Sequence, residues 1–163
     1  YVQGTYLPAA RQGARLAESQ LHGARTLSEW KARVRAGWPA VKLHALTQVP
    51  DEVLVTEPLR LRVAVTLGEL APADVCVEFV ARRTMPESRA QPPALAAHRP
   101  WPDDGAWSAT LRATGEREAD GAHVFAFDAP LVGCGRFAGE LRVHPYHELM
   151  THPHELGLMK WLS

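Results

Sequence analysis

The alternation of apolar and polar positions is clearest in the middle of the chain and predicts a strand. From Leu59 to Leu67 every second residue is leucine or valine, and arginine, alanine or threonine stands between them. This period of two is typical of a strand with one buried face. The other stretches with this pattern are 41–47, 75–80, 107–113, 123–127, 136–143 and 157–161, with a short edge strand expected at 95–98.

Turn-forming residues separate these stretches and set the fold class. Pro50-Asp51-Glu52 and Pro72-Ala73-Asp74 each stand between two predicted strands. About seven short strands at regular spacing are typical of two packed antiparallel sheets. We therefore expect a mainly β protein: an immunoglobulin-like two-sheet β-sandwich that is preceded by one or two α-helices.

The first forty residues have a helical period instead. Residues 4–23 carry a narrow stripe of mostly alanine at spacings of three and four, which predicts a helix. Small residues suit close approach to another surface, and they fit equally well an ordinary helix packed on this same domain. Both interpretations stay open.

A second helix is expected to begin near Thr26. Thr26-Leu27-Ser28-Glu29 fits a capping box, and Gly37 with Pro39 should end the helix. The apolar stripe on this segment consists of Leu27, Trp30, Val34 and Trp38. We expect the two tryptophans to anchor the helix to the core.

Composition narrows the possible functions. The chain has 163 residues, enough for one domain, and its 18 basic residues balance 18 acidic ones. Zero net charge argues against binding to nucleic acid or to an anionic membrane surface. The sequence has no long apolar run and no signal peptide, so we expect a cytoplasmic location. Because the first residue is Tyr1, we expect a piece of a longer protein.

The two cysteines, Cys76 and Cys134, are expected to be reduced. An immunoglobulin-type disulfide wants a tryptophan soon after the first cysteine, and the next one here is Trp101. Without a secretion signal, both cysteines fit as small apolar residues. A disulfide between them stays the alternative.

Four histidines close together near the end raise the question of a metal site. They are His144, His147, His152 and His154. Zinc needs three or four converging ligands, but the helical H-E-x-x-H motif is absent and two prolines interrupt the segment. We therefore expect these histidines to be donors and acceptors in a surface loop, with no bound metal.

No other motif indicates catalysis, so we expect no catalytic and no cofactor-binding residue in this chain. A phosphate-binding glycine loop and a nucleophile elbow are both absent. Trp101 and Trp107 are candidates for stacking on sugar, or they cap one end of the sandwich. The expected structural anchors are Trp30, Trp38, Tyr146 and Trp161. Trp161 should close the core, so that its removal costs about 3–5 kcal/mol.

Both ends of the chain resemble a known enzyme family. Near the C-terminus the matching residues are Arg142, Val143, Pro145, Tyr146, His147, His152, Pro153, Glu155, Gly157, Leu158 and Trp161. Near the N-terminus, Tyr6-Leu7-Pro8-Ala9 and 30–35 add to the likeness. These segments resemble the C-terminal region of bacterial and archaeal α-glucan (glycogen/maltodextrin) phosphorylases.

The resemblance implies a parent enzyme whose chemistry lies elsewhere. Members of this family are glycosyltransferases that release glucose 1-phosphate from α-1,4-glucan with pyridoxal phosphate held by a lysine. The three lysines here, Lys31, Lys42 and Lys160, lie in no segment that resembles the family's cofactor site. The resemblance therefore implies pyridoxal phosphate in the parent and no cofactor in this chain.

Two functional hypotheses follow from the sequence. In the first, residues 1–40 form a helical prefix at the end of the catalytic body, and 41–163 form a non-catalytic sandwich that packs on that body. In the second, the chain is a stand-alone carbohydrate-binding module that recognises α-glucan through its loop aromatics. A small metalloenzyme built on the histidine cluster is a third possibility.

Overall fold

The computed structural model describes residues 22–48, 58–83, 106–130 and 137–162. The side chains of a few residues at the ends of these ranges, among them Trp107, are not described. The predicted helix at 4–23 falls almost entirely outside these residues. So do the predicted edge strand at 95–98, Trp101 and Cys134.

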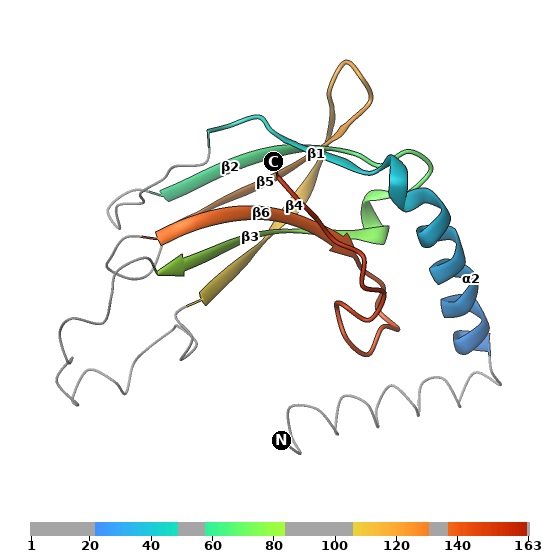
Figure 1. Ribbon diagram of the computed structural model, residues 1–163. Helices are drawn as coiled ribbons and strands as arrows, with labels where there is room; N and C mark the ends of the chain where they lie inside the picture. Colours follow the sequence, from blue (N-terminus) through green and yellow to red (C-terminus); the bar gives the residue numbers. More distant parts are fainter. Residues whose placement is uncertain (1–21, 49–57, 84–105, 131–136, 163) are drawn as a thin grey trace, which may run out of the picture.

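In the part of the chain that the structure describes, seven antiparallel strands dominate, which confirms the mainly β prediction (Figure 1). Their order across the sheet is β1-β2-β5-β4-β3-β6-β7. The strands are β1 (Lys42–Ala45), β2 (Pro58–Thr66), β3 (Val75–Arg83), β4 (Ala106–Arg117), β5 (His123–Pro130), β6 (Phe137–Pro145) and β7 (Lys160–Trp161).

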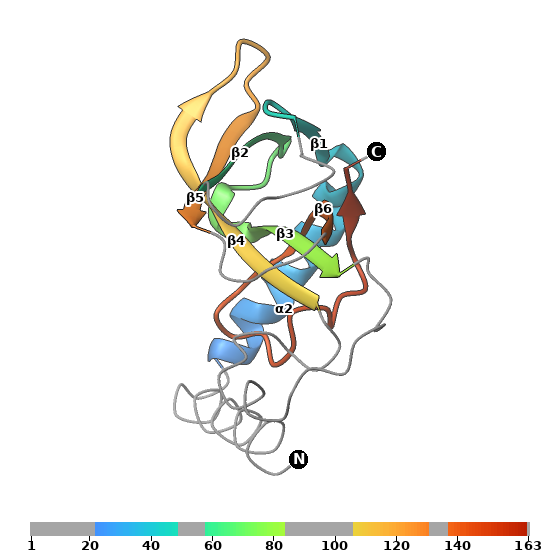
Figure 2. The same cartoon turned by 90° about the vertical axis from the view of Figure 1, so that its left-hand side faces the viewer.

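The single sheet folds over on itself through β4 (Figure 2). The first half of β4, from Ala106 to Leu111, pairs with β3, whereas the second half, from Arg112 to Arg117, pairs with β5. One strand therefore belongs to both layers, and the layers β1-β2-β5 and β3-β6-β7 face each other. This arrangement is consistent with the predicted β-sandwich preceded by a helix.

The two edge strands, β1 and β7, meet on the remaining side and nearly close the sheet. The Nζ atom of Lys160 donates to the carbonyl oxygens of Val41 at 2.6 Å and Pro39 at 3.2 Å. Leu162 N donates to Leu141 O at 2.8 Å beyond the end of β7. A lysine side chain thus takes the place of backbone pairing between edges that would otherwise be open.

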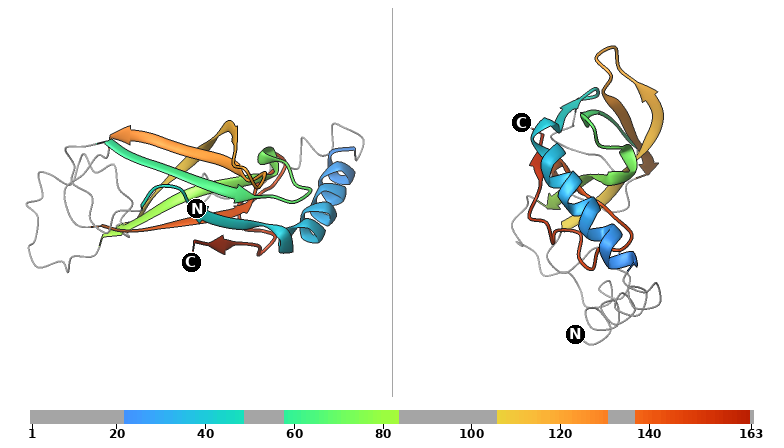
Figure 3. Two further views of the ribbon diagram at one scale, coloured as in Figure 1. Left: turned by 90° about the horizontal axis from the view of Figure 1, so that it is seen from above. Right: turned by 90° about the vertical axis from the view of Figure 1, so that its right-hand side faces the viewer.

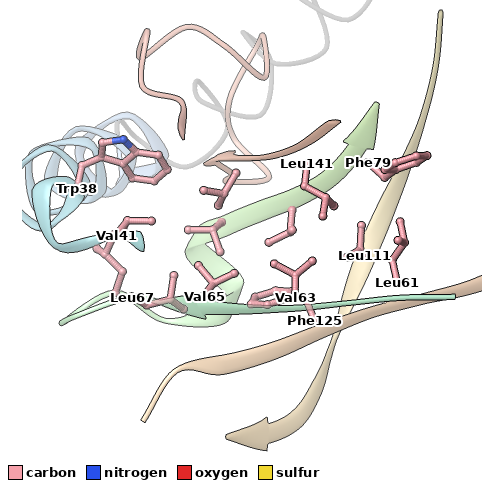
Figure 4. Packing of buried hydrophobic residues seen from close by; sticks show 14 of the residues in the cluster. Trp38, Val41, Leu61, Val63, Val65, Leu67, Phe79, Leu111, Phe125 and Leu141 are labelled. Carbon is pink, nitrogen blue, oxygen red and sulfur yellow. The ribbon is translucent and has the colours of Figure 1, made fainter. Parts of the chain in front are cut away.

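The core lies between the two layers (Figure 4). Alternation in each strand directs one set of side chains inward, as the period of two predicted. Fully buried residues include Leu61, Val63, Val65, Val77, Phe79, Leu141 and Val143. Gly139 in β6 is required by this packing, because a Cβ atom there would lie 2.2 Å from the ring of Phe79.

Helix α2 (His22–Gly37) and the short 3-10 helix η2 (Trp38–Ala40) close one end of the sandwich (Figure 3). The predicted stripe is buried: Leu27, Trp30, Val34 and Trp38 are at most 8% exposed. The predicted capping box is wrong, because the helix already begins at His22 and Thr26 lies within it. Within the described residues, no helix is long and apolar enough to span a membrane.

Gly37 is the last residue of α2, as predicted, but packing and not backbone conformation explains why a glycine stands here. Its backbone is right-handed helical, with φ −80°, so it makes no use of glycine's conformational freedom. A Cβ atom at this position would lie 3.0 Å from Cδ2 of Leu70. Pro39 then prevents continuation of the helix, since it has no N–H to donate.

The last predicted strand, 157–161, shrinks to the two residues of β7. Gly157 has a φ of +65° and stands in a turn, so regular pairing with β6 is limited to Trp161 with Arg142 and Lys160 with Val143. Trp161 faces away from the core and is 42% exposed. Its predicted role in closing the core is therefore wrong, because the alternation in β7 directs Lys160 toward β1 and the indole outward.

Candidate functional site

The outer face of β3 and β6 carries a row of polar residues instead of the usual solvated surface. Alternation directs Val77 and Val143 inward and their neighbours outward. The antiparallel register then sets Cys76 directly opposite His144, and Glu78 opposite Arg142. Cross-strand partners lie about 5 Å apart, so these four side chains meet. We call these four residues the outer-face cluster.

Arg142 and Glu78 form a half-buried ion pair in this cluster. Nε and Nη2 of Arg142 lie 2.8 Å and 2.7 Å from Oε2 of Glu78. A contact with His144 lowers the pKa of Glu78 to about 2, against the opposing effect of burial and together with Arg142. The other side of the guanidinium lies 5.5 Å from the ring centroid of Trp161, a cation–π distance. Glu78 is therefore ionised and held in one place.

His144 is the most buried member of the outer-face cluster, at 2% exposure. Its Nδ1 lies 2.9 Å from the carbonyl oxygen of Pro145. Because a carbonyl only accepts, Nδ1 carries the proton and Nε2 of the neutral ring is a bare acceptor. Nε2 lies 3.5 Å from Oε2 of Glu78 and has no hydrogen-bond partner. Burial alone would lower the pKa of His144, but the contacts with Cys76, Glu78 and the Pro145 carbonyl outweigh it and raise the pKa to about 9, so that without a metal ion Nε2 also carries a proton.

The segment 146–159, which we call the β6–β7 connection, lies over the outer-face cluster. The ring of His154 lies edge-on to that of His144, with 4.9 Å between the centroids. Nδ1 of His154 is buried and has no hydrogen-bond partner. Burial first, and then the charge of His144, lower the pKa of His154 below its ordinary value. The two rings are thus neighbours, and each has one buried nitrogen without a hydrogen-bond partner.

The other two histidines of the connection act as the sequence predicted. Nδ1 of His147 accepts from Leu149 N at 3.1 Å, and Nδ1 of His152 accepts from His154 N at 3.1 Å. Both bonds tie a side chain to the backbone two residues later. They stabilise turns in an irregular segment.

A metal-ligand set is present where sequence reasoning did not look for one. Three donor atoms lie within 4.8 Å of one another, one each from Cys76, Glu78 and His144. His144 is therefore not a surface-loop residue, as we expected, but a buried residue of β6. The histidine-rich segment drew attention to ligands close in sequence, whereas the partners of His144 come from β3. The available signal was Cys-x-Glu on the polar face of a strand.

A second buried polar group, Asp74, lies two residues before Cys76. Its Oδ1 accepts from Nε1 of Trp30 at 2.8 Å and from Nη2 of Arg33 at 2.9 Å. Its Oδ2 accepts from Nη1 of Arg33 at 2.8 Å and from Ala71 N at 2.8 Å. Burial raises the pKa of Asp74, but the bonds from Arg33, Ala71 and Trp30 outweigh it and leave the pKa below its ordinary value. This group joins α2 to the strand layer.

The aromatic residues singled out from the sequence have different positions. Trp30 and Trp38 are each 5% exposed. Tyr146 and Trp161 are 51% and 42% exposed, so neither is a core residue, contrary to what we predicted for Trp161. Tyr146 is bound through its backbone instead, since its N–H donates to Asp74 O at 2.8 Å. Trp107 lies in β4, but its side chain is outside the described part of the structure.

A groove of about 410 Å³ is open on another part of the surface. It lies between residues 66–72 and the turn from β4 to β5, and Arg117, Asp120 and His123 contribute to its wall. Among its described lining residues there is no tryptophan, tyrosine or phenylalanine. The groove therefore has no aromatic platform for a sugar ring.

Comparison with known proteins gives a consistent result. Residues 38–163 match the protein family described as "Glycogen phosphorylase C-terminal domain". Over 161 residues the chain is 29% identical to glycogen phosphorylase from Mycobacterium tuberculosis, in strains CDC 1551 and H37Rv, and from Mycobacterium bovis. These matches cover 98% of this chain and 17% of each relative. No solved structure matches the chain.

Proposed function

Because this chain belongs to the glycogen phosphorylase C-terminal domain family, we propose that it is the non-catalytic end of an α-glucan phosphorylase and packs against that enzyme's catalytic body. The observation that carries this proposal is the coverage of the match. Almost the whole chain aligns, but it accounts for only 17% of the curated relatives. The parent would be a cytoplasmic glycosyltransferase that releases glucose 1-phosphate from α-1,4-glucan.

The positions of the lysines support a non-catalytic role. A Schiff base with pyridoxal phosphate needs a lysine whose amine is available in a pocket. Nζ of Lys160 is bound to two backbone carbonyls, and Nζ of Lys31 lies 2.8 Å from Glu155. Lys42 is exposed on the edge strand β1. We infer that the parent holds its pyridoxal phosphate upstream of this chain.

The exposed aromatics give the packing surface a location. Tyr146 directly follows β6, and Trp161 belongs to β7, the neighbouring strand; both side chains are exposed. Large exposed aromatic side chains are enriched at protein interfaces. We infer that this side of the sandwich contacts the catalytic body.

Separate expression of the two parts of a parent phosphorylase tests the proposal. The chain alone, incubated with glycogen, phosphate and pyridoxal phosphate, should give no glucose 1-phosphate, and turnover by the pure chain would overturn the proposal. Mixed with the catalytic body, the chain should co-elute with it. Trp161→Ser should weaken that complex, whereas Asp128→Asn, in the other layer, should leave it unchanged.

α-Glucan binding is the second candidate function. The exposed indole of Trp161, with Arg142 against its ring, offers a face on which a sugar could stack. Trp101 and Trp107 are the further candidates from the sequence. A titration with maltoheptaose, followed by tryptophan fluorescence in the wild type and in Trp101→Ala and Trp161→Ala, distinguishes the two functions. Saturation that one of these substitutions removes favours the module, and an unchanged signal up to millimolar sugar excludes it.

A further inference from the structure

We propose that Cys76, Glu78 and His144 bind one Zn²⁺ ion, with a water molecule in the fourth position. This site is independent of the proposed packing role, since it concerns the outer-face cluster of the sandwich itself. Thiolate, carboxylate and neutral imidazole are the protein groups that zinc accepts.

The first argument is the electrostatics at His144. The hydrogen bond from Nδ1 to Pro145 leaves Nε2 as an acceptor, and it is aimed at the ionised carboxylate of Glu78, 3.5 Å away. If the ring were neutral, two acceptors would face each other in a site with 2% exposure, so that either a proton on Nε2 or a metal ion lies between them. The geometry therefore calls for positive charge at this position.

The second argument is the spacing of the donor atoms. Zinc bonds of about 2.0–2.3 Å in a tetrahedral site put neighbouring ligand atoms roughly 3.4–3.8 Å apart. The Nε2–Oε2 separation of 3.5 Å falls in this range. The full set with Cys76 lies within 4.8 Å, so a small contraction brings three ligands to one ion.

The third argument is that the ligands are already held from behind. The Pro145 carbonyl fixes the tautomer of His144, and Arg142 fixes the carboxylate of Glu78. In known zinc sites, hydrogen bonds of this kind orient the residues that bind the metal directly. Cys76 and His144 are also cross-strand partners on two paired strands. The three ligand residues are therefore held in position before a metal ion binds.

The fourth argument separates a metal ion from a simple proton. A proton on Nε2 of His144 would pair with Glu78 alone, whereas a zinc ion would also bind the thiolate of Cys76, whose Sγ atom belongs to the same ligand set.

Metal analysis of the untagged chain tests the site. After chelator treatment and dialysis against zinc, elemental analysis should give one zinc per chain. Cobalt in place of zinc should show a thiolate-to-metal charge-transfer band, which Cys76→Ser removes. Cys76→Ser and His144→Gln should each weaken zinc binding by at least about ten-fold, as is usual for damage to a zinc site.

His147→Gln is the matched control, because Nδ1 of His147 already accepts a backbone N–H and lies outside the ligand set. It should bind zinc like the wild type. Should His144→Gln fail to fold by circular dichroism, Cys76→Ser alone carries the test. A wild-type chain without stoichiometric zinc, or zinc binding that Cys76→Ser leaves unchanged, would overturn the site and show that His144 is an imidazolium paired with Glu78. Neither result depends on phosphorylase activity, so the packing proposal stands or falls separately.

Discussion

Two buried polar groups in this chain have opposite surroundings: Asp74, and the outer-face cluster with His144, whose member Cys76 follows Asp74 by two residues. The carboxylate of Asp74 accepts four hydrogen bonds, from Trp30, from Arg33 twice and from Ala71. In the outer-face cluster, by contrast, Nε2 of His144 has no partner, and neither has Nδ1 of the adjacent His154.

The difference between the two groups indicates different purposes. A fully satisfied network rigidifies a fold and leaves no ligand capacity. A buried polar atom without a partner is rare in native proteins and calls for an explanation, such as an unseen ion. We therefore assign a structural role to the group around Asp74 and a binding role to the outer-face cluster.

Removal of the Asp74 carboxylate should have the largest effect on stability among the polar substitutions. Asp74→Ala leaves Arg33, the Trp30 indole and Ala71 N without their acceptor at the junction of α2 with the strands. Breaking a fully buried pair costs more, but the side chain of Arg33 is 50% exposed and can regain water. We therefore expect the free energy of unfolding to fall by about 2–4 kcal/mol. Urea unfolding measures this loss.

Asp128→Ala is the control for that substitution. Asp128 also pairs with an arginine, Arg60, at 3.3 Å, but both side chains are more than 60% exposed. Surface pairs contribute about 0–1 kcal/mol. Equal losses in the two variants would remove the distinction between the buried network and an ordinary surface pair.

Acid should weaken the same network in a defined direction. The pKa of Asp74 in the folded chain lies below its ordinary value of 3.8. Its contribution to stability is therefore fully present above pH 3.8 and is lost as the pH falls below this value. Unfolding of wild type and Asp74→Asn between pH 2 and 6 should show a smaller acid-dependent loss in the variant. Parallel curves would mean that Asp74 has no part in the acid sensitivity.

Trp161→Ala should cost less, about 1–2 kcal/mol, because the cost of removing a buried tryptophan is about 3–5 kcal/mol and this one is partly in solvent. At 42% exposure it loses only part of its contacts, together with the cation–π contact to Arg142. Urea unfolding beside Trp38→Ala, which removes a 5% exposed residue, gives the reference. A larger loss in Trp161→Ala than in Trp38→Ala would make the indole a core residue after all.

Much of the fold was predictable because burial has a period. Alternation placed six of the strands closely, and the helical stripe through Trp30 and Trp38 identified the buried face of α2. The prediction failed where the alternating segment is short. After Gly157 only two residues pair with β6, and the turn that ends at Gly157 sets the direction in which Trp161 faces. Packing also decided Gly139, whose need for a missing Cβ depends on Phe79 from another strand.

The candidate site was less predictable, because its members meet only through strand register. Cys76 and Glu78 are two residues apart on one strand, and His144 is placed beside them by the pairing of β3 with β6. No local spacing carries that information. The histidine-rich segment 144–154 was visible in the sequence, but of its four histidines only His144 and His154 have buried nitrogens without a hydrogen-bond partner. The structural network around Asp74 was equally hidden, since it joins residues 30 and 33 to residue 74.

The smallest effect that we predict within the Asp74 network is also the most direct test of that network. Trp30→Phe keeps an aromatic ring in the buried stripe but removes the Nε1 donor, one of the four hydrogen bonds to Asp74. Because Oδ1 keeps its bond from Arg33, we expect a loss of about 1 kcal/mol, the net contribution of one hydrogen bond. Urea unfolding of both single variants and the double variant forms a cycle. In the Asp74→Ala background Trp30→Phe should cost almost nothing, since the acceptor is already gone. An equal cost in both backgrounds would mean that the indole acts only by packing, and the group around Asp74 would then be less different from the outer-face cluster than its geometry indicates.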